Sequence, residues 1–109
     1  MALALNVFHT VTAVVSTSAT EVYIAPVGYT GVVLLAQIAN TGTTSADVTF
    51  IHRRSSTDTE LLKEYPISAK DTSNLITGKL VLESGDKLVL YGSNASNLKF
   101  VASLLETLN

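Results

Sequence analysis

Residues 30–40 read Thr-Gly-Val-Val-Leu-Leu-Ala-Gln-Ile-Ala-Asn, and this stretch decides the fold. It is rich in aliphatic and β-branched residues, has the length of a long strand and lacks helical periodicity. Successive side chains of a strand point to opposite faces. One face would carry Val32, Leu34, Ala36 and Ile38, and the other Val33, Leu35, Gln37 and Ala39.

A strand that is apolar on both faces needs two covers. In an antiparallel sandwich one face of each strand meets the core and the other normally meets water. Gln37 is the only long polar side chain between residues 32 and 39. We therefore predict an oligomer interface, in which another copy of the chain covers the second face. The predicted interface residues are Val33, Leu35, Gln37 and Ala39.

Strand-length apolar runs continue on both sides of this segment, separated by clusters of Gly, Ser, Thr, Asn and Asp. We assign strands to residues 5–15, 21–25, 47–53, 61–67, 75–83, 87–91 and 98–105. Residues 78–92 indicate a β-hairpin that turns at Ser84-Gly85-Asp86, and residues 53–60 indicate a polar loop. Pro66 cannot donate to a sheet ladder, so it marks an edge strand or a strand end.

These features predict one all-β domain over residues 1–109. Turns about every dozen residues favour an antiparallel two-sheet β-sandwich with jelly-roll or Greek-key topology and seven to eight strands. An up-and-down barrel is the alternative. A barrel interior that holds a ligand would need more aromatic and polar inward positions than the pattern offers.

The composition is poor in charge and rich in apolar residues. Charged residues make up 15% of the chain and hydrophobic residues 47%, whereas an average soluble domain has about 25% charged residues. A subunit can hide such a surface in a subunit contact, which favours an oligomer. The net charge of −2 and the scattered basic residues disfavour nucleic acid as a partner.

The apolar segments do not predict a membrane protein. No run reaches the roughly 18 apolar residues of a membrane-spanning helix. Residues 1–15 lack a basic start and are interrupted by polar residues, so we interpret them as a strand and not as a signal peptide.

Few residues form patterns that are typical of catalysis or metal binding. His9 and His52 have no partners at metal-ligand spacing, and the chain contains no cysteine. The aspartates fall in turns or near strand ends, where Asp caps backbone amides. We therefore predict no catalytic, cofactor-binding or metal-binding residues, no cofactor, and a protein that is not an enzyme.

Two polar segments are candidates for contact with a partner protein. The first is the turn at residues 41–46, which contains Thr43 and Thr44. The second begins at His52, Arg53 and Arg54, which together form a small basic cluster. Isolated surface charges usually contribute little binding energy, so a solvated strand end is the alternative interpretation of this cluster.

Residues 65–106 carry a resemblance to a known group of proteins. The matching stretches are Pro-Ile-Ser-Ala-Lys-Asp at 66–71, Gly-Lys-Leu-Val-Leu-Glu-Ser-Gly-Asp-Lys-Leu at 78–88 and Phe-Val-Ala-Ser-Leu-Leu-Glu at 100–106. With the strand at 31–40, they resemble a small structural protein that is common in the virion gene sets of tailed bacteriophages.

The resemblance implies a repeated virion component without catalytic residues. It favours a capsid decoration (cement) protein that forms homo-oligomers, most simply trimers, binds the major capsid protein or another virion protein, and is made in the host cytoplasm. A tail, neck, baseplate or fibre-associated subunit is the alternative. A carbohydrate-binding module is weaker, because only 6% of residues are aromatic and none is tryptophan.

Overall fold

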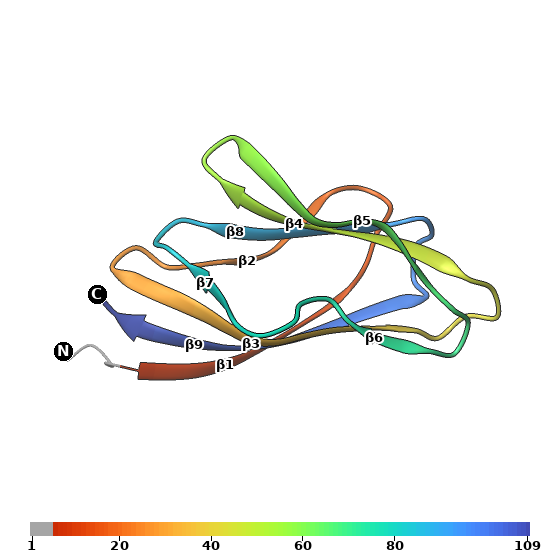
Figure 1. Cartoon of the computed structure of the whole chain (residues 1–109), viewed down its shortest axis with the longest axis horizontal. Coiled ribbons are helices and arrows are strands. Elements are labelled where there is room, and N and C mark those ends of the chain that lie inside the picture. The colour runs from red at the N-terminus through yellow and green to blue at the C-terminus, as the bar shows by residue number, and fades with distance from the viewer. Residues whose placement is uncertain (1–5) are drawn as a thin grey trace.

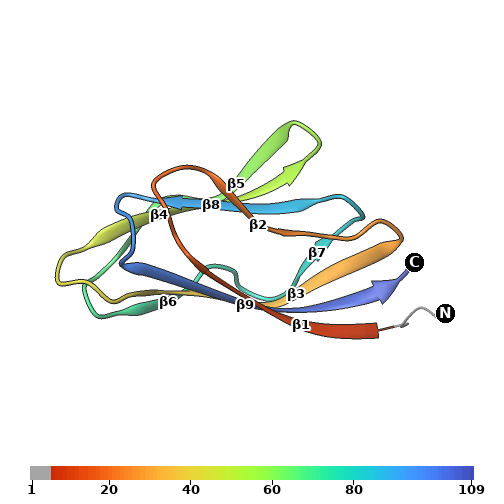
Figure 2. The same ribbon diagram turned by 180° about the vertical axis from the view of Figure 1, so that it is seen from behind.

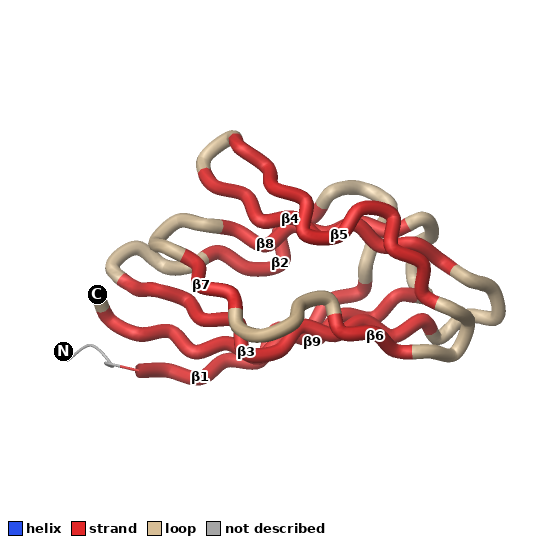
Figure 3. The backbone as a smooth tube through the Cα atoms, in the orientation of Figure 1, coloured by secondary structure: helices blue, strands red, loops and turns tan. Residues whose placement is uncertain are grey.

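The computed structural model describes residues 6–109 and contains strands and loops in that range, with no helix (Figure 3). No helix that could cross a membrane therefore occurs in the described part. The strands are β1 (Asn6–Val14), β2 (Thr20–Ile24), β3 (Tyr29–Asn40), β4 (Ala46–Arg54), β5 (Thr57–Ile67), β6 (Thr72–Asn74), β7 (Leu80–Leu82), β8 (Lys87–Gly92) and β9 (Leu98–Leu108). Leu5, the expected first residue of the first strand, lies outside the described residues.

The strands form two antiparallel layers that face each other across one core (Figures 1 and 2). We name them sheet A, with the order β1-β9-β3-β6 and β7 also paired with β3, and sheet B, with the order β2-β8-β4-β5. Consecutive strands repeatedly change layer, and β1 lies beside β9 while β2 lies beside β8, which is the wrapping of a jelly roll. The predicted all-β, two-sheet sandwich is confirmed.

Residues 6–109 form nine strands, whereas the sequence predicts seven to eight. The excess arises because one edge of sheet A is divided into two short strands. β7 pairs with Gly31–Val33 and β6 pairs with Gln37–Ala39, with a gap between them along β3. These two strands share one jelly-roll position, so the wrapping is that of eight strands.

The core lies between the sheets and takes alternate residues from the long strands of both. Phe50 on β4 and Phe100 on β9 are buried, with ring centroids 5.9 Å apart in a tilted arrangement. Such tilted aromatic pairs contribute beyond the apolar area that they bury. The other buried members include Val33, Ile38, Val48, Leu82, Leu88, Leu90, Leu98 and Leu104.

The side-chain alternation of β3 is interrupted by a bulge. Val33 lies opposite Leu104 and Leu35 lies opposite Ser103, so Leu34 is the extra residue. Both Val33 and Ile38 consequently point into the core, although simple alternation placed them on opposite faces. The predicted interface position of Val33 is therefore wrong, because its side chain is fully buried within its own chain.

The predicted hairpin at residues 78–92 is also wrong. β7 pairs with β3 in sheet A, whereas β8 pairs with β2 and β4 in sheet B. The turn at Ser84-Gly85-Asp86 thus carries the chain from one layer to the other. Gly85 adopts a φ of 87°, which glycine tolerates, and the Asp86 carboxylate accepts the backbone N–H of Glu83 at 2.9 Å. A hairpin turn within one sheet uses the same residue types, so the sequence does not distinguish it from this turn between the two sheets.

The expected polar loop at residues 53–60 is instead part of a long hairpin. β4 runs to Arg54 and β5 begins at Thr57, with Ser55 in a left-handed conformation at the turn. Its tip rises away from the two layers (Figure 1), so residues on both faces meet water and no apolar alternation reveals the strands. β5 lies at the edge of sheet B, as Pro66 predicts.

Candidate interaction surface

The outward face of sheet A carries a row of apolar side chains that crosses four strands. Phe8 on β1 lies opposite Leu105 on β9, Leu105 lies opposite Val32 on β3, and Val32 lies opposite Val81 on β7. Phe8 is 74% exposed and Val81 is 56% exposed. Direct cross-strand neighbours have Cβ atoms about 5 Å apart, so the four side chains form one continuous patch. We call it the apolar row.

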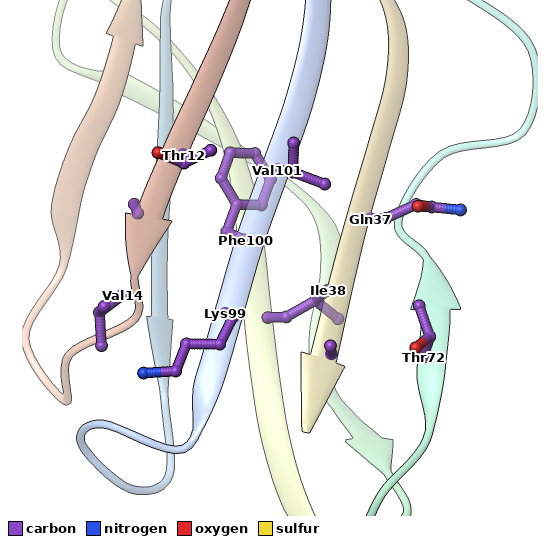
Figure 4. Close-up of a pocket in the computed structure, with 10 residues that line it drawn as sticks. Thr12, Val14, Gln37, Ile38, Thr72, Lys99, Phe100 and Val101 are labelled. Carbon is purple, nitrogen blue, oxygen red and sulfur yellow. The ribbon is translucent and has the colours of Figure 1, made fainter. Parts of the chain in front are cut away.

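Next to the apolar row the same face is hollowed into an open groove of about 520 Å³. Figure 4 shows the side chains that line it, which come from the neighbouring strands β1, β9, β3 and β6. They include Thr12 and Val14 of β1, Lys99 and Val101 of β9, Gln37 and Ala39 of β3 and Thr72 of β6. Among the outward strand residues of sheet A in the range 6–109, Lys99 alone is charged. We call the groove and the apolar row together the sheet A face.

Sheet B shows the opposite surface. Its outward residues include Glu21, which pairs with Lys87 at 2.9 Å, and Arg53, which donates to Asp58 at 2.6 Å. Two outward apolar residues on its central strands, Ile51 and Val89, are 4% and 0% exposed. Sheet B therefore covers the apolar side chains at its centre and leaves Ile24 of its edge strand β2 exposed, whereas sheet A leaves Phe8 and Val81 uncovered.

Three of the four predicted interface residues lie on the outward side of sheet A. Leu35 is 37% exposed, and Gln37 and Ala39 are half-buried. Gln37 donates from Nε2 to Oδ1 of Asn74 at 2.9 Å, which joins β3 to β6 across the face. Whether a second copy contacts these residues stays a prediction.

Sequence reasoning missed the contribution of β1 and β9 to this face. The outward positions Phe8, Val101 and Leu105 follow the usual alternation, which gave a signal for each strand separately. Their adjacency to β3 arises from pairing between the first, third and last long strands. A single sequence contains no signal for that pairing.

The two candidate partner-contact segments lie at opposite ends of β4. Thr43 and Thr44 are exposed in the loop that precedes Ala46, and Arg54 ends the strand. A nine-residue strand spans about 30 Å, so the structure does not bring the two segments together. Their contact with another protein stays a prediction.

The basic cluster is engaged within the chain. Asp86, with a side chain only 2% exposed, accepts two hydrogen bonds from the Arg54 guanidinium at 2.9 and 2.8 Å. The carboxylate also lies 3.0 Å from Nε2 of His52. The Arg54 bonds are the main reason that the pKa of Asp86 lies well below its usual range. The cluster thus ties the β4 end to the turn between β7 and β8.

A second buried polar group joins the two sheets at β2, an edge strand of sheet B. Tyr23 of β2 donates its hydroxyl to Glu106 Oε2 of β9 at 2.6 Å, and His9 Nε2 lies 2.8 Å from the other carboxylate oxygen. Burial is the main cause of the raised Tyr23 pKa, and the bond to Glu106 adds to it. Across residues 6–109, no group of three His, Cys, Asp or Glu side chains converges as a metal site.

The fold defines the chain as a two-sheet jelly-roll sandwich. No protein-family model and no curated protein matches it. The chain is similar to a solved structure described as "Bacillus endospore appendages form a novel family of disulfide-linked pili". The two are 13% identical with a TM-score of 0.56, and the match covers 95% of this chain and 88% of the other. At this identity the similarity concerns the fold.

Proposed function

We propose that the chain is a non-enzymatic structural subunit that assembles with copies of itself through the sheet A face. The observation that carries this proposal is the unequal treatment of the two outward faces. Sheet B has ion pairs beside the covered side chains of Ile51 and Val89 and exposes Ile24 only at its edge, whereas sheet A exposes Phe8 and Val81 and has Lys99 as its one charged outward strand residue in the described part. Contiguous exposed apolar surface of this kind is typical of protein contacts.

The size of the sheet A face fits a contact between folded proteins. β1 has nine residues, which corresponds to a length of about 30 Å, and four strands spaced about 4.8 Å apart are about 19 Å wide with their side chains. The resulting footprint of about 570 Å² is a large part of the roughly 800 Å² that each partner contributes to a standard interface. Another copy is the occupant that fits this surface, because its own face is equally apolar and Lys99 is the one charged outward strand residue that it brings in the described part.

At a finer level, we propose that this subunit belongs to a phage particle, with capsid decoration as the leading role. The support for the virion is the sequence resemblance over residues 65–106. The support for decoration is a small, charge-poor sandwich that would attach by surface contact, with the major capsid protein as partner and trimers as the expected oligomer.

A second candidate is a subunit of a fibre, tail or other extended appendage. It is favoured by the similarity to the structure described as disulfide-linked pili. This chain has no cysteine, so its own assembly could not use disulfide links. The sheet A face serves either candidate.

The test of self-assembly is sedimentation of the wild-type chain and of two matched Val→Asp variants. Val81 lies in the apolar row, whereas Val27 is 91% exposed in the loop before β3. Burial of one valine contributes about 1.5 kcal/mol, so Val81→Asp should raise the dissociation constant at least about tenfold. Val27→Asp should not change it.

Circular dichroism checks that both variants keep their β-sheet spectrum. A wild-type chain that sediments only as a monomer, or equal effects of the two substitutions, would contradict the proposal. The location is tested separately by quantitative mass spectrometry of purified particles. Decoration requires a copy number comparable to that of the major capsid protein, whereas a tail component requires a small multiple of the tail symmetry.

A further inference from the structure

The edge strands of the two sheets differ sharply in how they are protected against pairing with another chain. β5 contains Pro66, a left-handed Glu64 and two interruptions of register with β4. β2 has five residues and a bulge, and β6 and β7 have three residues each. Short length, bulges, proline and charge are the usual means of blocking an edge.

β1 has none of these protections. It pairs with β9 through all nine residues without a register shift, and its sequence Asn-Val-Phe-His-Thr-Val-Thr-Ala-Val contains no proline, glycine, Asp, Glu, Lys or Arg. It also exposes two large apolar side chains, Phe8 and Val14. An edge that is long, regular and uncharged is a template for an added strand.

The free backbone groups of β1 can be identified from its pairing. Val15 donates its N–H to the Leu98 carbonyl at 2.9 Å, continuing the register in which Val14 lies opposite Lys99. Hydrogen-bonded and non-hydrogen-bonded pairs alternate along an antiparallel ladder. The odd-numbered residues therefore bond to β9, and the even-numbered residues direct their N–H and C=O groups to the open edge. These residues are Asn6, Phe8, Thr10, Thr12 and Val14.

We propose that β1 pairs antiparallel with β1 of a second copy, about a twofold axis at Thr10. In this register Asn6 lies opposite Val14 of the second copy and Phe8 lies opposite Thr12. Every residue with free edge groups then meets another of the same set, and all nine residues overlap. A shift by two residues would leave free groups unpaired at both ends, and a shift by one would turn core-facing side chains outward.

The second copy is the partner that the chain itself supplies with a matching strand. Self-pairing places no like charges opposite each other, and the outward side chains of both copies fall on the same side of one continuous sheet. The sheet A faces of the two copies therefore join into one larger face. The inference rests on the proposed function only in taking another copy of this chain as the partner.

A charge exchange at Thr10 tests the pairing in the full chain. Thr10 is exposed, so Thr10→Lys and Thr10→Glu should fold normally, which circular dichroism verifies. Each variant alone sets like charges opposite each other and should weaken the contact about fivefold or more, whereas an equimolar mixture should restore it. Sedimentation of the separate and mixed variants measures this. A mixture that associates no better than either variant alone would overturn the pairing.

The absence of native cysteine allows a second test, of register. Thr10→Cys places two Cα atoms about 5.5 Å apart across the axis, within the range for a disulfide. Thr12→Cys would leave its thiols separated by four residues along the strand, about 14 Å, which is too far. Under mild oxidation the first variant should form covalent dimers rapidly and the second should not.

These results separate the edge contact from the proposed function. Equal crosslinking of the two cysteine variants in a chain that still assembles, and that Val81→Asp still disrupts, would overturn the edge pairing alone. The opposite result is rapid crosslinking of Thr10→Cys together with an assembly that Val81→Asp does not weaken. It would support the edge pairing and contradict the contact through the sheet A face.

Discussion

Two adjacent arginines on β4 make the same bond in very different surroundings, and this allows a sharp prediction about stability. Arg54 donates two hydrogen bonds to Asp86, and Arg53 donates two to Asp58. The Asp86 side chain is 2% exposed, whereas that of Asp58 is 38% exposed at the hairpin. We predict that Asp86→Asn destabilises the fold strongly and that Asp58→Asn hardly affects it.

The magnitude follows from the partners of Asp86. Its carboxylate accepts two bonds from Arg54 and the backbone N–H of Glu83, and it lies in hydrogen-bond reach of His52. An amide keeps one acceptor oxygen and turns an NH₂ group towards these donors. Breaking a buried charged pair costs about 3–5 kcal/mol, and the retained oxygen places the loss for Asp86→Asn near the lower end, at about 3 kcal/mol. Exposed pairs such as that of Asp58 contribute little.

Urea unfolding followed by circular dichroism, at one fixed protein concentration, measures both variants. The pH dependence provides a second readout. Because the folded-state pKa of Asp86 is lowered, its contribution is present above the ordinary pKa of about 4 and is lost as the pH falls below it. The wild-type chain should therefore lose stability in acid more steeply than Asp86→Asn. Equal destabilisation by the two substitutions, or parallel acid curves, would refute the reasoning.

Two further substitutions probe the packing between the sheets. Tyr23→Phe removes the hydroxyl bond to buried Glu106 and should cost about 1–2 kcal/mol of stability near neutral pH. Because the Tyr23 pKa is raised, the stability of the wild-type chain should also fall above about pH 10. Urea unfolding across this pH range should show a shallower fall in the variant. Gly92→Ala would place a Cβ 2.7 Å from the Leu98 side chain and 3.2 Å from the Asp47 carbonyl oxygen. We therefore expect urea unfolding to show a free energy of unfolding lower by about 1–3 kcal/mol. An unchanged unfolding midpoint would contradict this.

The elements that sequence predicts well are those in which apolar alternation runs uninterrupted. Val11 and Ala13 of β1 pack on the core, and Leu88 and Leu90 of β8 are buried, as period-two patterning indicates. The edge position of β5 follows from the missing donor of Pro66. These predictions need only local information.

The errors arise where a distant contact decides the conformation. No glycine or proline marks the bulge at Leu34 in the sequence. The bulge changes which alternate residues of β3 face the core, from odd-numbered before it to even-numbered after it. The turn at Gly85 reads as a hairpin, but Asp86 is held by Arg54 from another strand, and the chain changes sheet there. The candidate surface could not be predicted from the sequence for the same reason, because β1, β9 and β3 become neighbours only in the folded sheet.

The pairing of Asn6 with Thr107 brings the start of the first strand beside the end of the last strand. A short linker could therefore join the two ends, and new termini could be opened at Ser55 in the hairpin tip that stands clear of both layers (Figure 1). A circular permutant of this kind would carry a fused peptide or enzyme on the hairpin, away from the outward face of sheet A. The jelly roll thus offers a scaffold on which cargo and the proposed assembly face would occupy separate parts of the molecule.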